Sequence, residues 1–257
     1  MRYKSRLSAS NKLKGEIQMG IYVAAKYVFW LFLYSFIGWV YESILCSISA
    51  RRWINRGFLN GPYCPIYGWG ALLVILILGK IKNPLLIFLL GMLVTCSLEY
   101  FSSYLMEKLF HARWWDYSAR KFNINGRVCL IGAIVFGSFS VILIKFIHPM
   151  VLHLTNSIPN VPLCCISAIV GTAMLIDLIV TLRGFAGFDT YLKELSATIE
   201  KLKDELTDKH LDPFVKRLSR QQKRMVNAFP KLRSMHYDGP LSRIRKIISQ
   251  RKDINGQ

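Results

Sequence analysis

The sequence predicts an all-α membrane protein, a polytopic bundle of about five spans with a basic helical C-terminal tail. Three observations support this: 53% of the residues are hydrophobic, the formal net charge is +19, and 16 of the 34 Lys and Arg residues follow Gly184. Such a composition is typical of a membrane protein that carries a basic soluble part. We therefore expect a basic leader at 1–20, a transmembrane domain at 21–184 and a cytoplasmic, basic, helical or coiled-coil tail at 185–257.

The apolar segments have near-bilayer length and are separated by short polar loops. In chain order they cover residues 21–48, 63–79, 84–109, 127–149 and 161–183. The first is too long for the apolar region of a signal peptide, and no small-residue cleavage site follows it. The second is shorter, so a re-entrant hairpin is the alternative to a span. With a cytoplasmic tail, five spans leave seven Lys and Arg outside and the hairpin leaves five, so the positive-inside rule does not separate the two.

The stretch at 57–70 is rich in Gly, Pro and aromatic residues and lies between the first two apolar segments. Pro62 and Pro65 remove backbone donors, while Gly61 and Gly68 permit tight turns or close helix contact. Irregular backbone at membrane depth persists only when it packs in protein or lines a wet cavity, so this stretch predicts a site. The alternative is an ordinary interfacial loop with an aromatic belt.

Three acids, Glu42, Glu99 and Asp177, lie inside three different spans. A charged carboxylate there costs about 2.5–3.5 kcal/mol and usually marks function. In the five-span arrangement all three lie about 9–12 Å below the cytoplasmic surface, which favours this arrangement over the hairpin. The alternative is that Glu42 or Glu99 forms a structural ion pair with Arg127 or a loop arginine. Asp177 is interpreted as a packing or gating residue.

A second informative loop runs over 111–127 and contains two Trp beside Asp and Tyr. This combination suits a lid at headgroup level, although an aromatic belt plus a turn would look similar. Asn125-Gly126 predicts a turn that places Arg127 in the first turn of the fourth span. We predict one substrate-binding pocket in the cytoplasmic leaflet, in which Glu42, Glu99 and Arg127 are coupled. Its candidate residues are Glu42, Asn60, Tyr63, Glu99, Trp115, Asp116, Tyr117, Asn125 and Arg127.

Several ordered motifs carry a family resemblance. They are Phe32-Leu-Tyr-Ser-Phe-Ile-Gly-Trp-Val-Tyr-Glu42, Asn55-Arg-Gly-Phe-Leu-Asn-Gly-Pro-Tyr-Cys-Pro-Ile-Tyr-Gly68, Glu99-Tyr100, Trp115-Asp-Tyr117 and Asn125-Gly-Arg-Val-Cys129. Over residues 30–185 the chain resembles the bacterial family described as putative ABC-transporter permease, type IV (CmpB), and its basic tail resembles that family's extension. The resemblance implies an integral membrane transport protein. Because the chain has no Walker A run, a separate ATPase subunit is the expected partner, unless an ion gradient drives transport.

The tail begins with an apolar stripe of alternating steps of three and four, which is typical of a heptad repeat. Its members are Phe185, Phe188, Leu192, Leu195, Ile199, Leu202 and Leu206. The stripe needs a partner: either it packs within the chain, or it forms a homodimer through 185–206. Two basic amphipathic segments follow, one from Pro213 and one around Leu241, Ile244 and Ile248. They could pack on the stripe or lie on anionic lipid headgroups.

No catalytic residue can be assigned, since no His lies near the membrane acids and the six cysteines show no metal-ligand spacing. We therefore expect no cofactor and no metal, and an enzyme is the less favoured class. Three functions stay open: a transporter, an enzyme or binding protein acting on lipid headgroups with Arg127 as anion clamp, and a non-catalytic scaffold. The expected location is the cell membrane, multi-pass, with the tail in the cytoplasm, where the basic residues would meet anionic lipid rather than nucleic acid.

Overall fold

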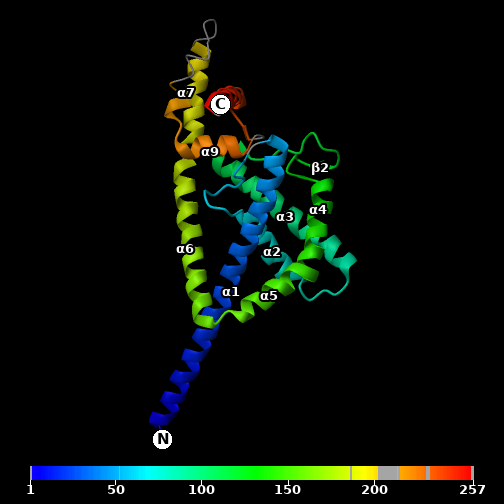
Figure 1. The fold of residues 1–257 in the computed structure, drawn as a ribbon, viewed down its shortest axis with the longest axis vertical. Helices are drawn as coiled ribbons and strands as arrows, with labels where there is room; N and C mark the ends of the chain where they lie inside the picture. The colour runs from blue at the N-terminus through cyan, green and yellow to red at the C-terminus, as the bar shows by residue number, and fades with distance from the viewer. Residues whose placement is uncertain are drawn as a thin grey trace.

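The computed structural model describes residues 2–51, 53–185, 187–201, 213, 215–229 and 232–255 (Figure 1). These residues are mostly helical, and four helices are long and apolar enough to cross a membrane, which confirms the predicted fold class. The membrane part contains α1 (Arg2–Ala50), α2 (Pro65–Leu78), α3 (Pro84–Phe110), α4 (Leu130–Ile142), the π-helical segment η1 (Leu143–Ile147), α5 (His148–Ser157) and α6 (Asn160–Phe185). The tail contains α7 (Phe188–Lys201), α9 (Arg220–Ala228) and α10 (Asp238–Asn255).

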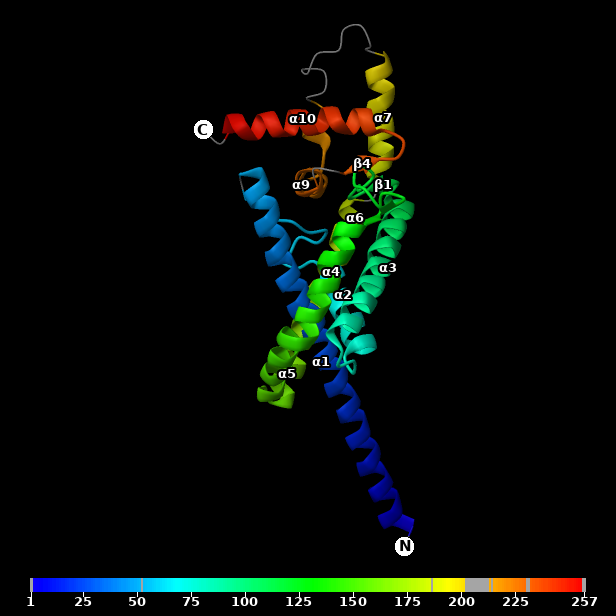
Figure 2. The ribbon, with the colours of Figure 1, turned by 90° about the vertical axis from the view of Figure 1, so that its right-hand side faces the viewer.

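The helices run up and down, so that both long loops and the tail gather at one end of the bundle (Figures 1 and 2). We call this the loop end. The first loop covers residues 53–64 and the second loop residues 111–127. The N-terminal part of α1 extends away from the bundle at the opposite end. The predicted leader is thus helical from Arg2 and continuous with the first span.

Short strands accompany the second loop. β2 (Asn123–Ile124) pairs with β3 (Val128–Cys129), and β1 (Ala112–Arg113) pairs antiparallel with β4 (Arg233–Ser234) of the tail. Between β2 and β3, Asn125 has φ 53° and Gly126 φ 67°, the left-handed values that the Asn-Gly pair was predicted to supply. Arg127 lies in this turn, and the short strand β3 separates it from α4, which begins at Leu130. The prediction that Arg127 lies in the first turn of the fourth span was therefore wrong.

The short α2 has 14 residues, about 21 Å at 1.5 Å per residue, and is not among the four long helices. Pro65 starts it, because a proline at the first helical position gives up no hydrogen bond. A Cβ added at Gly68 would overlap the Ser35 hydroxyl and the Leu31 carbonyl of α1. Gly68 therefore permits the close α1–α2 contact that the sequence indicated.

The third of the four long apolar helices, Leu130–Ser157, corresponds to the fourth predicted span and extends beyond its predicted end at residue 149. Pro149 is the second residue of α5, and the π-helical η1 precedes it. Proline cannot donate to the carbonyl four residues earlier, and a π-helical turn shifts the local bonding pattern to five residues. The helix therefore continues past Pro149 to Ser157, where hydropathy alone predicted a stop.

The tail has a hydrophobic core of its own at the loop end. Leu192 and Leu195 of the predicted stripe are 1% and 0% exposed, in one cluster with α9 and α10. The stripe therefore packs within the chain, as the first alternative held, although Leu202 and Leu206 lie outside the described residues. The second loop enters the same core through Trp114, whose ring centroid lies 4.9 Å from that of Phe229. The tail thus covers the loop end of the bundle.

Candidate functional site

Asp177 of α6 holds the first loop in place. Its carboxylate accepts hydrogen bonds from the Asn60 backbone and side chain (3.1 and 2.7 Å), the Gly61 N–H (2.8 Å), the Tyr63 hydroxyl (2.8 Å) and Thr181 (3.2 Å). Two of the predicted site residues, Asn60 and Tyr63, are thus bound to Asp177 and not to Glu42 or Glu99. The geometry fits the packing interpretation of Asp177, because five donors fill the acceptor positions of one carboxylate.

Glu42 of α1 lies between α2 and the first loop. The Tyr67 hydroxyl donates to Glu42 Oε1 (2.5 Å), and Arg56 Nε lies 3.6 Å from Glu42 Oε2. Arg56 also reaches the tail, where it donates to the Ala228 carbonyl and lies 4.3 Å above the Phe229 ring. Glu42 therefore pairs with a loop arginine, as the structural alternative proposed.

Glu99 of α3 meets the second loop. The Tyr117 hydroxyl donates to Glu99 Oε1 (3.2 Å), and Glu99 as a residue is only 7% exposed. Burial of Tyr117, followed by the nearby negative charge of Glu99 and more weakly that of Glu42, raises the pKa of the Tyr117 phenol. The Tyr117 hydroxyl is therefore a stable donor to Glu99.

Arg127 is buried beside Glu107, which lies about two helical turns beyond Glu99 on α3. Arg127 Nη2 lies 3.0 Å from Glu107 Oε2, and Arg113 binds the same oxygen at 2.8 Å. Arg127 also donates to the Ser103 hydroxyl (3.3 Å). The predicted pairing of Arg127 with Glu42 is therefore wrong, because Glu107 and Arg56 supply the counter-charges instead.

The other candidates in the second loop fix the loop itself. Trp115 donates to the Arg127 carbonyl (3.0 Å), and Asn125 donates to the Tyr100 hydroxyl (3.0 Å). Asp116 accepts from Ser118 and pairs with Arg233 of the tail at 3.1 Å. The Ser118 hydroxyl bond, with help from Arg233, lowers the pKa of the Asp116 carboxyl. Asp116 therefore ties the second loop to the tail.

Two buried atoms under the second loop keep unused hydrogen-bonding capacity. Glu99 Oε2 and Arg127 Nε lack a hydrogen-bond partner within the described residues, as do Trp114 Nε1, in the tail core, and Arg245 Nε of α10. An unsatisfied buried polar group costs about 1–3 kcal/mol, so atoms of this kind usually have a partner that the protein alone does not supply. No group of three His, Cys, Asp or Glu side chains suited to a metal ion occurs in the described parts of the chain.

The structure therefore divides the predicted pocket into three local groups at the loop end. One contains Asp177, Asn60 and Tyr63, and the other two contain Glu42 and the Glu99–Arg127 region. Sequence reasoning missed Glu107 and Tyr67. A signal for Glu107 existed, since Glu99, Ser103 and Glu107 recur every four residues and so share one face of α3.

Four long apolar helices with charged residues under two loops define a polytopic helical membrane protein. The sequence model of the family described as Putative ABC-transporter type IV (CmpB) matches residues 29–182, more than half of the 257 residues, and the chain belongs to that family. Searches of curated proteins and of solved structures find no significant match. The resemblance seen in the ordered motifs is thus confirmed.

Proposed function

We propose that the chain is a membrane transport protein in which the groups under the second loop bind a polar or lipid-like substrate. The observation that carries this proposal is the pair of buried, unpartnered atoms Glu99 Oε2 and Arg127 Nε. The first is an acceptor and the second a donor, so a substrate with both a donor and an acceptor would satisfy the two together. The family assignment supports transport as the process.

A bound substrate would gain free energy from two groups that are buried without a partner. Glu99 and Arg127 are each 7% exposed, so water does not freely replace a missing partner. A bound polar group removes a penalty that the empty site carries, and hydrogen bonds to charged groups contribute about 1.5–3 kcal/mol each. Tyr117 would form an adjoining polar wall, because its hydroxyl donates to Glu99. Glu42 and Tyr67 form a separate polar pair beside the first loop.

The proposal includes an orientation and a partner. We place the loop end and the tail in the cytoplasm, supported by the cluster of arginines there, among them Arg56, Arg113 and Arg224, and by the positive-inside rule. Energy would come from a separate ATPase subunit that meets the chain on this face, because the sequence has no phosphate-binding loop of its own.

The experiment compares small molecules that copurify with the wild type and with Glu99→Gln, identified by mass spectrometry. Gln keeps the size and an acceptor but removes the charge, so we expect the variant to fold and to lose the bound compound. Glu16→Gln is the matched control, because Glu16 is an exposed acid on α1. A folded Glu99→Gln protein that carries the same compounds at the same occupancy as Glu16→Gln would contradict the proposal.

A further inference from the structure

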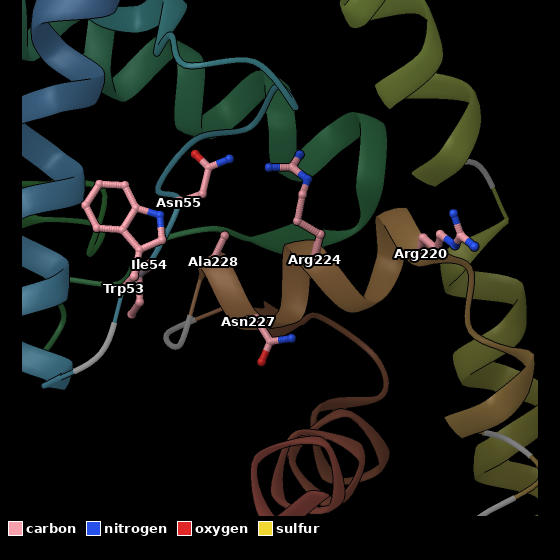
Figure 3. A pocket seen from close by; sticks show the side chains of 7 residues that line it. All are labelled: Trp53, Ile54, Asn55, Arg220, Arg224, Asn227 and Ala228. Carbon is pink, nitrogen blue, oxygen red and sulfur yellow. The ribbon is translucent and has the colours of Figure 1, made fainter. Parts of the chain in front are cut away.

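A pocket of about 370 Å³ lies at the loop end, outside the groups described above (Figure 3). The first loop forms one wall, with Trp53 and Asn55, and α9 forms the other, with Arg220, Arg224 and Asn227. This volume is within the range of pockets that hold small ligands. The lining includes two arginines and no acid.

The spacing of residues along α9 explains which of its side chains line the pocket. Positions 220, 224 and 227 follow steps of four and three, which place the three side chains along one side of the helix, although Figure 3 shows that their tips diverge. Met225, on another side, is fully buried in the tail core and fixes the helix. A capping box between Ser219 and Gln222 holds the start of α9. The wall is thus formed without a ligand.

Arg224 connects the two walls. Its Nη1 donates to the Gly57 carbonyl (3.1 Å) and its Nη2 to the Phe58 carbonyl (2.6 Å), and no carboxylate of the described residues forms an ion pair with it. Arg220 is exposed, and the described residues offer it neither a hydrogen bond nor an ion pair. Arg220 therefore has no counter-charge among the described residues, whereas Asp177 offsets part of the charge of Arg224. The pocket keeps a positive charge, which favours an anionic ligand.

Trp53 indicates where that ligand comes from. The residue is 69% exposed and lies three positions after the end of α1, with its ring 6.2 Å from that of Trp39. Exposed Trp at the end of a span is typical of the membrane–water interface, where lipid headgroups lie. Guanidinium groups match phosphate oxygens in geometry as well as charge.

We infer that this pocket is a phosphate-binding site at the membrane surface, occupied by the phosphate diester of an anionic lipid headgroup. Arg220, which the described residues leave without a partner, contacts the phosphate, Arg224 adds positive charge from the wall between the first loop and α9, and Trp53 lies against the glycerol end. The site is separate from Glu99 and Arg127, so it does not depend on the proposed substrate. A soluble phosphate compound shares the same chemistry and is separated by the experiment.

The experiment uses native mass spectrometry of the full-length protein with phosphatidylglycerol, phosphatidylcholine or inorganic phosphate added separately. We expect the wild type to retain phosphatidylglycerol over phosphatidylcholine. Arg220→Gln should lower that affinity about tenfold, the loss of one charge-assisted contact. Arg243→Gln is the matched control, because it removes another exposed arginine, from α10, that does not line the pocket.

Each outcome decides the inference. Retained phosphatidylglycerol that depends on Arg220 and not on Arg243 supports the lipid site. Binding of inorganic phosphate that depends on Arg220, without a lipid preference, assigns the same site to a soluble phosphate. Equal losses in Arg220→Gln and Arg243→Gln would show only general attraction to a basic surface and would overturn the inference, as would absence of any anion preference in the wild type.

Discussion

The two loops at the loop end are built alike but completed differently. Each lies over a carboxylate from a membrane helix, Asp177 under the first loop and Glu99 under the second, and each is covered by the tail. Asp177 accepts five hydrogen bonds from protein donors. Glu99 accepts one, and its second oxygen has no partner within the described residues.

Asp177 and Glu99 look equivalent in the sequence, but their hydrogen bonds suggest different roles: Asp177 stabilises a loop, and Glu99 can still bind a ligand. A carboxylate whose acceptor positions are all filled stabilises a loop and has nothing left to offer a ligand. A buried carboxylate with a bare oxygen carries an energetic cost that the fold tolerates, and such costs are concentrated at functional sites. The second loop is therefore the place to test for ligand binding, and the first loop is the place to test for stability.

The largest effect is expected from a substitution that unfolds the tail, because the tail covers both loops. Leu195→Asp places a charge at a fully buried position of the tail core, which should destabilise that core by more than about 4 kcal/mol. Membrane insertion should be unchanged, because it depends on the apolar segments of the spans and not on α7. Limited proteolysis should then cut the tail and both loops, at sites where we expect the wild type to resist cleavage.

Lys193→Asp is the control, since Lys193 lies on the exposed side of the same helix. It should keep the wild-type cleavage pattern. If Leu195→Asp resists proteolysis as well as Lys193→Asp does, the tail does not protect the two loops, and the proposal that it covers both of them is wrong.

The second effect is specific to the first loop. Asp177→Ala should lower the free energy of unfolding by about 2–4 kcal/mol, because it strands the Asn60, Gly61 and Tyr63 donors. Thermal unfolding in detergent measures the loss, and Asp177→Asn should lose less because it keeps one acceptor oxygen. Glu99→Gln provides the contrast: a loss as large as that of Asp177→Ala would mean that the two carboxylates play the same structural role.

The third effect concerns the pairing of Arg127. A double-mutant cycle of Arg127→Gln with Glu107→Gln should give a coupling of about 0.5–3 kcal/mol, since the two groups touch. The cycle of Arg127→Gln with Glu42→Gln should be additive to within about 0.3–0.5 kcal/mol, because Glu42 pairs with Arg56. Coupling in the second cycle and additivity in the first would reverse the assignment of partners.

The smallest effect is a pH dependence of the contact between the second loop and the tail. The lowered pKa of Asp116 means that its contribution to stability is complete above the unfolded value of about 3.9 and is lost as the pH falls through the lower folded value. The melting temperature of the wild type should therefore drop more between pH 6 and pH 3 than that of Asp116→Asn. Equal drops would show that this carboxylate does not secure the loop.

The sequence predicted the spans well because hydropathy and length are local properties. The third span was predicted at 84–109 and found at Pro84–Phe110, where Asn83 accepts hydrogen bonds from Leu85 and Leu86 to start the helix. The tail stripe was also predicted, because a heptad pattern reads directly from spacing. The extension past Pro149 was not, since a π-helical turn depends on packing around the helix.

The pairing of the charged groups was less predictable. Depth along the membrane normal follows from position in a span, and it brought Glu42, Glu99, Asp177 and Arg127 to one end correctly. Depth does not give the direction in which a side chain points around its helix axis, however. Arg127 therefore pairs with Glu107, which reasoning from depth did not include, and Asp177 accepts hydrogen bonds from the first loop.

The bond between Arg56 and the Ala228 carbonyl joins residues 172 positions apart, which sets an order of assembly. At about 5–20 residues per second, a ribosome makes Ala228 roughly 10–30 s after Arg56. Glu42 and Tyr67 are available to the first loop much earlier, so α1 and α2 can settle together while the nascent chain is still being made. The aromatic surface around Phe58 and Trp114 stays bare until the last part of the chain emerges, and it is the surface that a chaperone or a quality-control protease would meet first.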